Sequence, residues 1–360
     1  MCLSISLALI LFAGLTSARA AEDTKGKKGK KADSAPPTVF YPDPPEKPRI
    51  QFLRTFSSDK DVKPKTSGFM KFVVGSEVVP EQIVKPYGAT IISGQIMVCD
   101  IGRACVDVLD LEGKTFQRVG NGQQGPLKKP ANIAVDKDGV RYVVDTGHKT
   151  VMAYSSDWSF VRSYGDPEKI DPSDIVVFDD DLYVCDIEHG QVAVLDKKTG
   201  SEKRRIGQKG SDEGELFMPS NIAVDADGNV YVSDTGNARV LKYDPRGRYA
   251  KQVGARGTSP GQFVRPKGIA VDRERQLYVV DAAFENVQIF DPDGNLLLFF
   301  GGPGNVPGGI NLPTKVLLDY DNVGFFSDSV APGYEVDYLV LVCSQFGSNM
   351  VNVYGFLKAK

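Results

Sequence analysis

Apolar residues along this chain stand in short runs of Val, Ile, Leu and Tyr, which Gly, Asn and Asp separate at short intervals. The clearest stretch has four such runs, at about 221–224, 230–234, 239–243 and 249–253. Short runs of β-branched and aromatic residues bounded by turn formers predict strands joined by tight turns. Because no segment after residue 21 sustains a helical period, the pattern predicts an all-β fold.

The four-strand pattern recurs through most of the chain. Six prolines mark it at intervals of 42 to 47 residues: Pro86, Pro130, Pro172, Pro219, Pro266 and Pro313. A repeat of this length indicates a propeller or a solenoid. A single four-stranded sheet cannot bury both of its faces, so the sheets must stack on one another and close. The sequence therefore predicts a six-bladed β-propeller of four-stranded antiparallel blades.

Aspartates recur within the units at a fixed spacing of nine residues, as in Asp136 with Asp145 and Asp225 with Asp234. We predict that the first Asp of each pair forms the turn between the first two strands. Its carboxylate can accept bonds from backbone N–H groups two residues on. The second Asp is predicted to act in the same way before the turn between the second and third strands.

The fourth unit reads Pro219-Ser-Asn-Ile-Ala-Val-Asp225 and then Tyr231-Val-Ser-Asp-Thr-Gly-Asn237. These residues resemble the consensus of the NHL-repeat family, and the resemblance covers about residues 50–356. The resemblance implies a propeller, in an exported bacterial form here. It does not decide the activity, because the family includes lyases, RNA binders, sensors and scaffolds.

The sixth unit departs from the pattern. Pro313–Asp319 is a good first strand, but a long insertion, 320–337, comes before the next two runs at 338–344 and 350–354. The fourth strand is then missing at the C-terminal end. We predict that Ile50–Phe56 supplies it and closes the ring, as propellers protect their sheet edges by radial closure.

A competing register exists for this unit. Asp328 lies nine residues after Asp319, which would place the second strand at Phe325 and Phe326. That register leaves the run at 50–56 without a partner, so it ranks second.

The N-terminal part differs in composition. Residues 3–17 are apolar or small and are followed by Ala18-Arg-Ala20, which predicts a signal peptide over 1–20 and export to the periplasm or the cell exterior. Residues 21–48 are basic and Pro-rich and are predicted to form a disordered linker. The propeller then covers 49–357. No other stretch is long enough to span a membrane.

The formal net charge is −3, and it becomes −4 without Arg19. This balance disfavours a general nucleic-acid role, which requires a basic face. Cleavage would leave Cys99, Cys105, Cys185 and Cys343. Cys99 and Cys105 flank one predicted turn and could form a disulfide, or each cysteine could fill a buried strand position.

Polar residues recur two positions after the repeat prolines, at the expected mouth of the central channel. Asn132, Asp174 and Asn221 offer oxygen atoms there, which suit Ca²⁺. Six-bladed lactonases hold a catalytic Ca²⁺ at a comparable place in their propellers, but the resemblance carries none of their ligands over to this chain. The alternative is that Asn and Asp were selected to tolerate a positive φ, and Lys315 on the same ring counts against a bound cation.

The two histidines, His148 and His189, each lie three residues after a strand-end Asp on adjacent blades. Histidine is a common zinc ligand, and the amidating lyases of the NHL family hold zinc with three histidines from separate blades. The third ligand is missing here, and a zinc site would need a further group such as Glu188. The alternative is two exposed loop histidines.

The leading functional hypothesis is a non-catalytic propeller that binds a protein, glycan or small ligand in the cell envelope. The candidate contact residues in the insertion are Phe325, Phe326 and Tyr334, because exposed aromatic clusters mark interfaces. This hypothesis needs no cofactor. The alternative is a hydrolase or lyase assisted by Ca²⁺ or Zn²⁺, with its site at the channel mouth.

Overall fold

A computed structural model describes residues 38–63, 79–120 and 127–358 of the chain. The predicted signal peptide and the linker up to residue 37 lie outside these residues. Five successive units form four-stranded antiparallel sheets, as the repeat predicted.

Their strands follow one another in chain order. Blade one contains β3 (Pro86–Ile92), β4 (Gln95–Asp100), β5 (Cys105–Asp110) and β6 (Thr115–Val119), and blade two contains β7 (Pro130–Val135), β8 (Arg141–Asp145), β9 (Thr150–Tyr154) and β10 (Phe160–Tyr164). Blade three contains β11 (Pro172–Phe178), β12 (Asp181–Asp186), β13 (Gln191–Asp196) and β14 (Glu202–Ile206), and blade four contains β15 (Pro219–Val224), β16 (Val230–Asp234), β17 (Arg239–Tyr243) and β18 (Tyr249–Val253). Blade five contains β19 (Pro266–Val271), β20 (Leu277–Asp281), β21 (Asn286–Phe290) and β22 (Leu296–Gly301).

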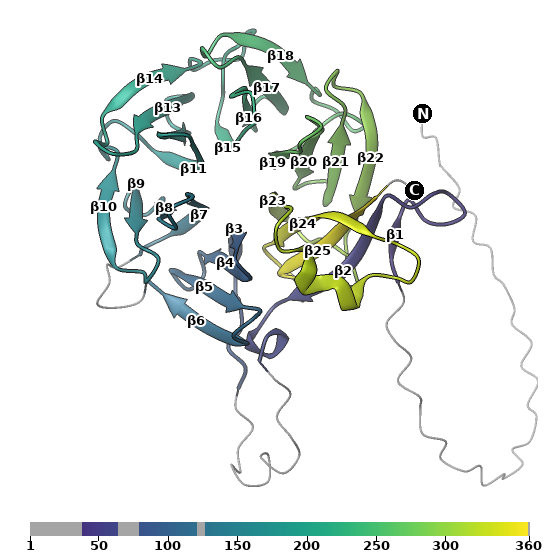
Figure 1. Ribbon diagram of the computed structural model, residues 1–360. Helices are drawn as coiled ribbons and strands as arrows, with labels where there is room; N and C mark the ends of the chain where they lie inside the picture. The colour runs from purple at the N-terminus through teal and green to yellow at the C-terminus, as the bar shows by residue number, and fades with distance from the viewer. Residues whose placement is uncertain (1–37, 64–78, 121–126, 359–360) are drawn as a thin grey trace, which may run out of the picture. The chain divides into compact units, whose positions relative to one another are not determined.

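The sixth blade, the closing blade, is made from both ends of the described chain. Its strand order is β1 (Phe40–Tyr41), β2 (Ile50–Phe56), β25 (Val351–Leu357), β24 (Val336–Ser344) and β23 (Pro313–Asp319). The innermost strands β3, β7, β11, β15, β19 and β23 contact one another in turn, and β23 contacts β3, so the ring is closed (Figure 1). The six-bladed propeller is therefore confirmed.

The N-terminal strand closes the ring as predicted. Strand β2 pairs antiparallel with β25, with Ile50 opposite Phe356 and Phe56 opposite Val351. The structure adds a short fifth strand, β1, which lies within the stretch that the sequence assigned to a linker; the Arg49 N–H donates to the Tyr41 carbonyl at 2.8 Å. The competing register is wrong, because Val323–Ser329 forms a 3₁₀ helix, η2, in place of a strand.

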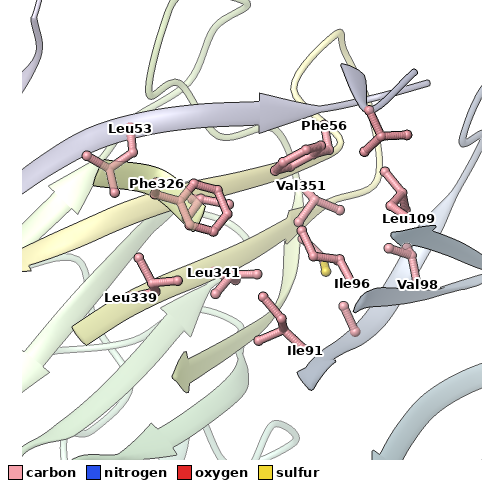
Figure 2. Packing of buried hydrophobic residues seen from close by; sticks show 14 of the residues in the cluster. Leu53, Phe56, Ile91, Ile96, Val98, Leu109, Phe326, Leu339, Leu341 and Val351 are labelled. Carbon is pink, nitrogen blue, oxygen red and sulfur yellow. The ribbon is translucent and has the colours of Figure 1, made fainter. Parts of the chain in front are cut away.

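Blade one and the closing blade share one hydrophobic cluster, which we call the joint core (Figure 2). Strand β2 contributes Leu53 and Phe56, and the insertion contributes Phe326. Blade one and the C-terminal strands β24 and β25 supply the rest, including Ile91, Ile96, Val98, Leu109, Leu339, Leu341 and Val351. The insertion is therefore part of the packing that closes the ring.

The recurring aspartates shape the turns as predicted. Asp136 Oδ1 accepts the N–H groups of Asp138 and Val140 at 3.0 and 2.9 Å, between β7 and β8. Its other oxygen accepts the Tyr142 hydroxyl at 3.1 Å. The same carboxylate–tyrosine contact joins Asp225 to Tyr231 at 3.2 Å, so the Asp–Tyr spacing reflects a hydrogen bond inside blades two and four. In blade five, Asp272 instead accepts the hydroxyl of Tyr338 from the closing blade at 3.1 Å.

The four cysteines of the described residues are free thiols in buried positions. Strand pairing places Cys99 opposite Val106 and Cys105 opposite Asp100. Because neighbouring residues of a strand point to opposite sides of a sheet, Cys99 and Cys105 face opposite sides of blade one. The Cys99–Cys105 disulfide is therefore wrong, and the alternative of buried packing holds.

Candidate functional site

Two families of connections gather at one end of the channel, and we call this end the loop face. It carries the loops that lead from one blade into the next and the loops between the second and third strands. Backbone bonds join the two families, as from Thr146 N–H to Lys129 O at 3.0 Å and from Gly236 N–H to Phe217 O at 2.8 Å. The opposite end, the turn face, carries the insertion between β23 and β24.

The strand-end aspartates hold the loop face together. In blade two, Asp145 accepts the N–H groups of Lys128, Lys129, Gly147 and His148 at 2.6 to 3.1 Å. The corresponding aspartates of the other four-stranded blades accept bonds from the same two loops; they are Asp100, Asp186, Asp234 and Asp281. The oxygen atoms of these carboxylates are therefore occupied by hydrogen bonds from the two loops.

A buried ion pair crosses the central channel. The Lys315 ammonium, on the closing blade, lies 2.7 Å from Oδ2 and 3.0 Å from Oδ1 of Asp174 on blade three. These two blades stand on opposite sides of the ring (Figure 1). Asn221 of blade four donates its amide to Asp174 Oδ2 at 3.0 Å. Asp174 and Asn221 have no exposed surface, and Lys315 is 8% exposed.

This ion pair changes the interpretation of the predicted calcium site. Asp174 and Asn221 do meet, but the cation beside them is the chain's own ammonium, which neutralises the carboxylate. Asn132 lies apart, with its amide donated to the Ser173 carbonyl at 2.9 Å and its Oδ1 without a protein partner among the described residues. Lys315, Asp174 and Asn221 therefore form a buried network of an ion pair and a hydrogen bond across the channel.

The positive-φ explanation for this ring is also wrong. Asn132, Asp174 and Asn221 all lie in strands, and none has a positive φ. Gly88 and Gly268 stand at the same repeat position because the neighbouring strand approaches closely. A β-carbon on Gly88 would lie 2.0 Å from Asn132 Oδ1.

Both histidines lie on the loop face of adjacent blades, as predicted, and each contacts its own strand-end Asp. His148 Nδ1 is 3.1 Å from Asp145 Oδ2, and His189 Nδ1 is 2.8 Å from Asp186 Oδ2. Asn237 occupies the equivalent place in blade four and donates to Asp234 at 2.7 Å. His189 and Asn237 brace their loops through these hydrogen bonds, whereas His148 Nδ1 lies near Asp145 without a hydrogen-bond partner among the described residues. No group of three metal-binding side chains occurs in the part of the chain that the structure describes.

The loop face also exposes apolar side chains that sequence reasoning missed. Five of them, which we call the apolar arc, are between 39% and 53% exposed: Val84, Phe217, Met218, Val264 and Phe346. They come from blades four, five and six and from the entry into blade one. The sequence contains a signal for three of them, since Val84, Phe217 and Val264 each stand two residues before a repeat proline.

Cationic side chains accompany the apolar arc. None of the following forms an ion pair with a carboxylate of the described residues: Lys85, Arg103, Lys128, Lys129, Lys209, Arg256 and Arg265. Two of the acids nearby are balanced, because Lys149 pairs with both Asp171 and Glu188 at 3.1 and 3.3 Å. Glu188, which the zinc hypothesis named as one possible further ligand, is thus the partner of a lysine. Asp212 and Glu213, in the loop that leads into blade four, are exposed and form no ion pair within the described residues.

The three predicted contact residues of the insertion separate in the structure. Phe326 is 2% exposed and packs edge-to-face against Phe56 with ring centroids 6.2 Å apart, so it belongs to the joint core and offers no contact surface. Phe325 is 42% exposed on the turn face. Tyr334 is 37% exposed and packs against Phe40 at 5.0 Å.

Asp107 in β5 is a buried carboxyl with one oxygen left without a hydrogen bond. Burial, aided by the charge of Asp100, raises the pKa of Asp107 to about 7, although Arg118 donates to its other oxygen at 2.9 Å. A raised folded-state pKa means that folding disfavours the carboxylate. The resulting penalty is absent below about pH 4, grows as the pH rises towards 7 and is complete above it.

We therefore expect Asp107→Asn to raise the free energy of unfolding at pH 8 by about 1–3 kcal/mol and to leave it nearly unchanged at pH 4. Urea unfolding at both pH values measures the difference. Asp328→Asn, at an exposed carboxylate of the insertion, is the control and should show no such pH dependence. An equal effect of Asp107→Asn at both pH values would contradict the explanation.

Comparisons with known proteins agree on the fold. A family model described as a 6-bladed beta-propeller matches residues 166–247 and 226–298. Among curated proteins, a probable peptidyl-alpha-hydroxyglycine alpha-amidating lyase of Caenorhabditis elegans is 28% identical over 105 residues. That alignment covers 28% of this chain and 30% of the lyase, so it spans less than a third of the relative's length.

Solved structures give the same result. A protein of unknown function from Bacteroides thetaiotaomicron has a TM-score of 0.59 at 17% identity, covering 85% of this chain and 75% of that chain. A gluconolactonase from Xanthomonas campestris has a TM-score of 0.56 at 16% identity, and the match covers 85% of this chain and 98% of that chain. A catalytically inactive virginiamycin B lyase from Staphylococcus aureus has a TM-score of 0.53 at 14% identity, and the match covers 76% of this chain and 95% of that chain. At these identities the likeness concerns the fold alone.

Proposed function

We propose that this chain is an exported propeller of the NHL type that binds a protein partner on its loop face. The observation that carries the proposal is the apolar arc together with nearby cations that form no ion pair with the described carboxylates. Isolated exposed apolar residues are ordinary, but here they recur at one end of the ring on successive blades. The partner would bring apolar side chains and carboxylates to this face, since charge complementarity guides such encounters.

The channel supports a binding role by its rigidity. Lys315, Asp174 and Asn221 connect three blades at the channel, so the loops around its mouth stand on a braced platform. A preformed surface loses less conformational freedom on binding than a mobile one. Export rests on the apolar run at 3–17, and N-terminal sequencing of the mature protein from its native host, with Ala21 as the expected first residue, tests it.

Affinity capture from the envelope fraction of the native host tests the binding face. We expect Phe217→Ser combined with Val264→Ser to reduce recovery of a co-purifying partner at least tenfold, because both exposed anchors are lost. The control, Phe160→Ser combined with Val161→Ser, removes residues of 46% and 54% exposure from the outer strand β10 and should retain the partner.

Two further arms complete this experiment. Charge reversal of Lys128, Lys129 and Arg265 should weaken capture and its dependence on salt, because these cations form no ion pair within the described part of the chain. Pretreatment with EDTA should leave capture unchanged. Equal recovery by both double-serine variants would contradict the loop-face assignment.

A metal-assisted lyase or hydrolase is the second candidate, and the partial similarity to the amidating lyase is the observation in its favour. Stoichiometric zinc or calcium in the purified protein, together with loss of capture after EDTA treatment, would favour it over the binding function.

A further inference from the structure

Two neighbouring cavities open beside the insertion on the turn face. The larger, of about 480 Å³, is lined by Ile91, Ile92, Ser93, Glu112, Asp319, Asp321, Asn322 and Phe325. The smaller, of about 230 Å³, is lined by Arg54, Asp61, Val62, Leu111, Lys114 and Phe325. They share Phe325, so its exposed ring stands between them. We call the pair the insertion groove.

Closing the ring explains only part of the insertion. Phe326 fills the joint core, and Asn322 fastens the insertion to blade one by accepting the Gly94 N–H at 2.6 Å. Gln51 of β2 holds its far end, with bonds to Ser329 O at 2.8 Å and from Ala331 N–H at 3.0 Å. None of these contacts requires the exposed ring of Phe325.

The two cavities have opposite charge. Three carboxyl groups and no basic side chain line the larger one. Asp319 is engaged by Asn322 through two bonds of 2.8 Å, and burial raises its pKa. Glu112 and Asp321 are exposed and form no ion pair within the described residues, so they supply the negative charge.

The smaller cavity is basic. Arg54 and Lys114 line it, and Lys114 is exposed and without an ion pair in the described part of the chain. The Asp61 carboxylate already accepts the Ser57 and Ser58 N–H groups at 2.7 and 2.8 Å. A carboxylate entering this cavity would therefore meet positive charge.

We propose that the insertion groove binds an extended protein segment and takes a lysine or arginine side chain of it into the larger cavity. A long cationic side chain matches this lining, because its apolar stem can lie on Ile91 and Ile92 while its charged end meets Glu112 and Asp321. The Phe325 ring adds a cation–π surface. An acidic residue of the same segment fits the smaller cavity. This site is independent of the loop face.

Methyl NMR of the propeller labelled at isoleucine tests the proposal through Ile91 and Ile92. The probes are acetyl-Arg-Ala-Asp-amide and its reverse sequence, each compared with the peptide in which citrulline replaces arginine. Citrulline has nearly the same shape without the charge. We expect at least one arginine peptide to shift both isoleucine signals with an affinity at least tenfold higher than its citrulline counterpart.

Variants locate the effect. Glu112→Gln combined with Asp321→Asn should lower the affinity for the arginine peptide at least tenfold. Lys114→Gln should lower that affinity only by the part that contact with the peptide's aspartate contributes. Asp328→Asn, on the insertion but outside the lining, is the control, and a thermal melt confirms that each variant is folded. Equal binding of arginine and citrulline peptides, or full binding by the Glu112→Gln/Asp321→Asn variant, would overturn the proposal. The loop-face variants leave this readout unchanged, so the two sites are tested separately.

Discussion

Lys315→Met should lower the free energy of unfolding by about 3–5 kcal/mol, because it leaves the Asp174 carboxylate buried without its counter-charge. The carboxylate would keep its bonds from Asn221 and from the backbone of Ile222 at 3.2 Å. Those neutral donors offset only part of the cost of a buried charge. Urea denaturation of the purified propeller at pH 7 measures the loss.

Two comparisons make the explanation specific. Adding Asp174→Asn to Lys315→Met removes the uncompensated charge, so the double variant should recover most of the lost stability. Lys128→Met removes an exposed lysine that has no ion pair among residues 38–63, 79–120 and 127–358, and should change stability by about 0.5 kcal/mol or less. A double variant as unstable as Lys315→Met would show that shape, and not charge, decides the effect.

Phe326→Ala should destabilise the propeller by about 3–5 kcal/mol, the usual cost of removing a buried phenylalanine. The ring packs among Leu53, Phe56 and Leu339 where the first and last blades meet (Figure 2). The lost packing should also loosen β2. Hydrogen exchange of the β2 amides, together with urea denaturation, measures both effects.

The neighbouring residue provides the control. Phe325→Ala removes a ring that is 42% exposed, so stability should change by about 1 kcal/mol or less while the insertion groove loses its shared wall. If the two alanine variants were equally unstable, the separation of the insertion into a packing half and a surface half would be incorrect.

The fold could be predicted because the same sequence pattern recurs from blade to blade. Each Pro-to-Asp unit specifies a blade locally, and the missing fourth strand of the last unit pointed to Ile50–Phe56 as its partner. The fifth strand escaped prediction, because Phe40 and Tyr41 lie in a Pro-rich stretch whose composition favours an extended chain. The path of η2 escaped as well, since tertiary packing of Phe326 decides it.

The channel shows where sequence reasoning about sites reaches its limit. The repeat placed Asn132, Asp174, Asn221 and Lys315 correctly on one ring. It could not show that Lys315 reaches across the channel to Asp174, because side-chain reach in three dimensions is not encoded in spacing. The apolar arc could be predicted only in part, because three of its five members stand two residues before a repeat proline, namely Val84, Phe217 and Val264.

The closing blade has a consequence for biosynthesis. Ile50 leaves the ribosome early, yet its partner Phe356 is made roughly three hundred residues later. Until then, blade one has no neighbour on one side and β2 presents an unpaired edge, a situation that invites wrong pairing with other chains. We therefore expect the folding of this chain to be more sensitive to its own concentration than the folding of a protein whose neighbouring strands are consecutive.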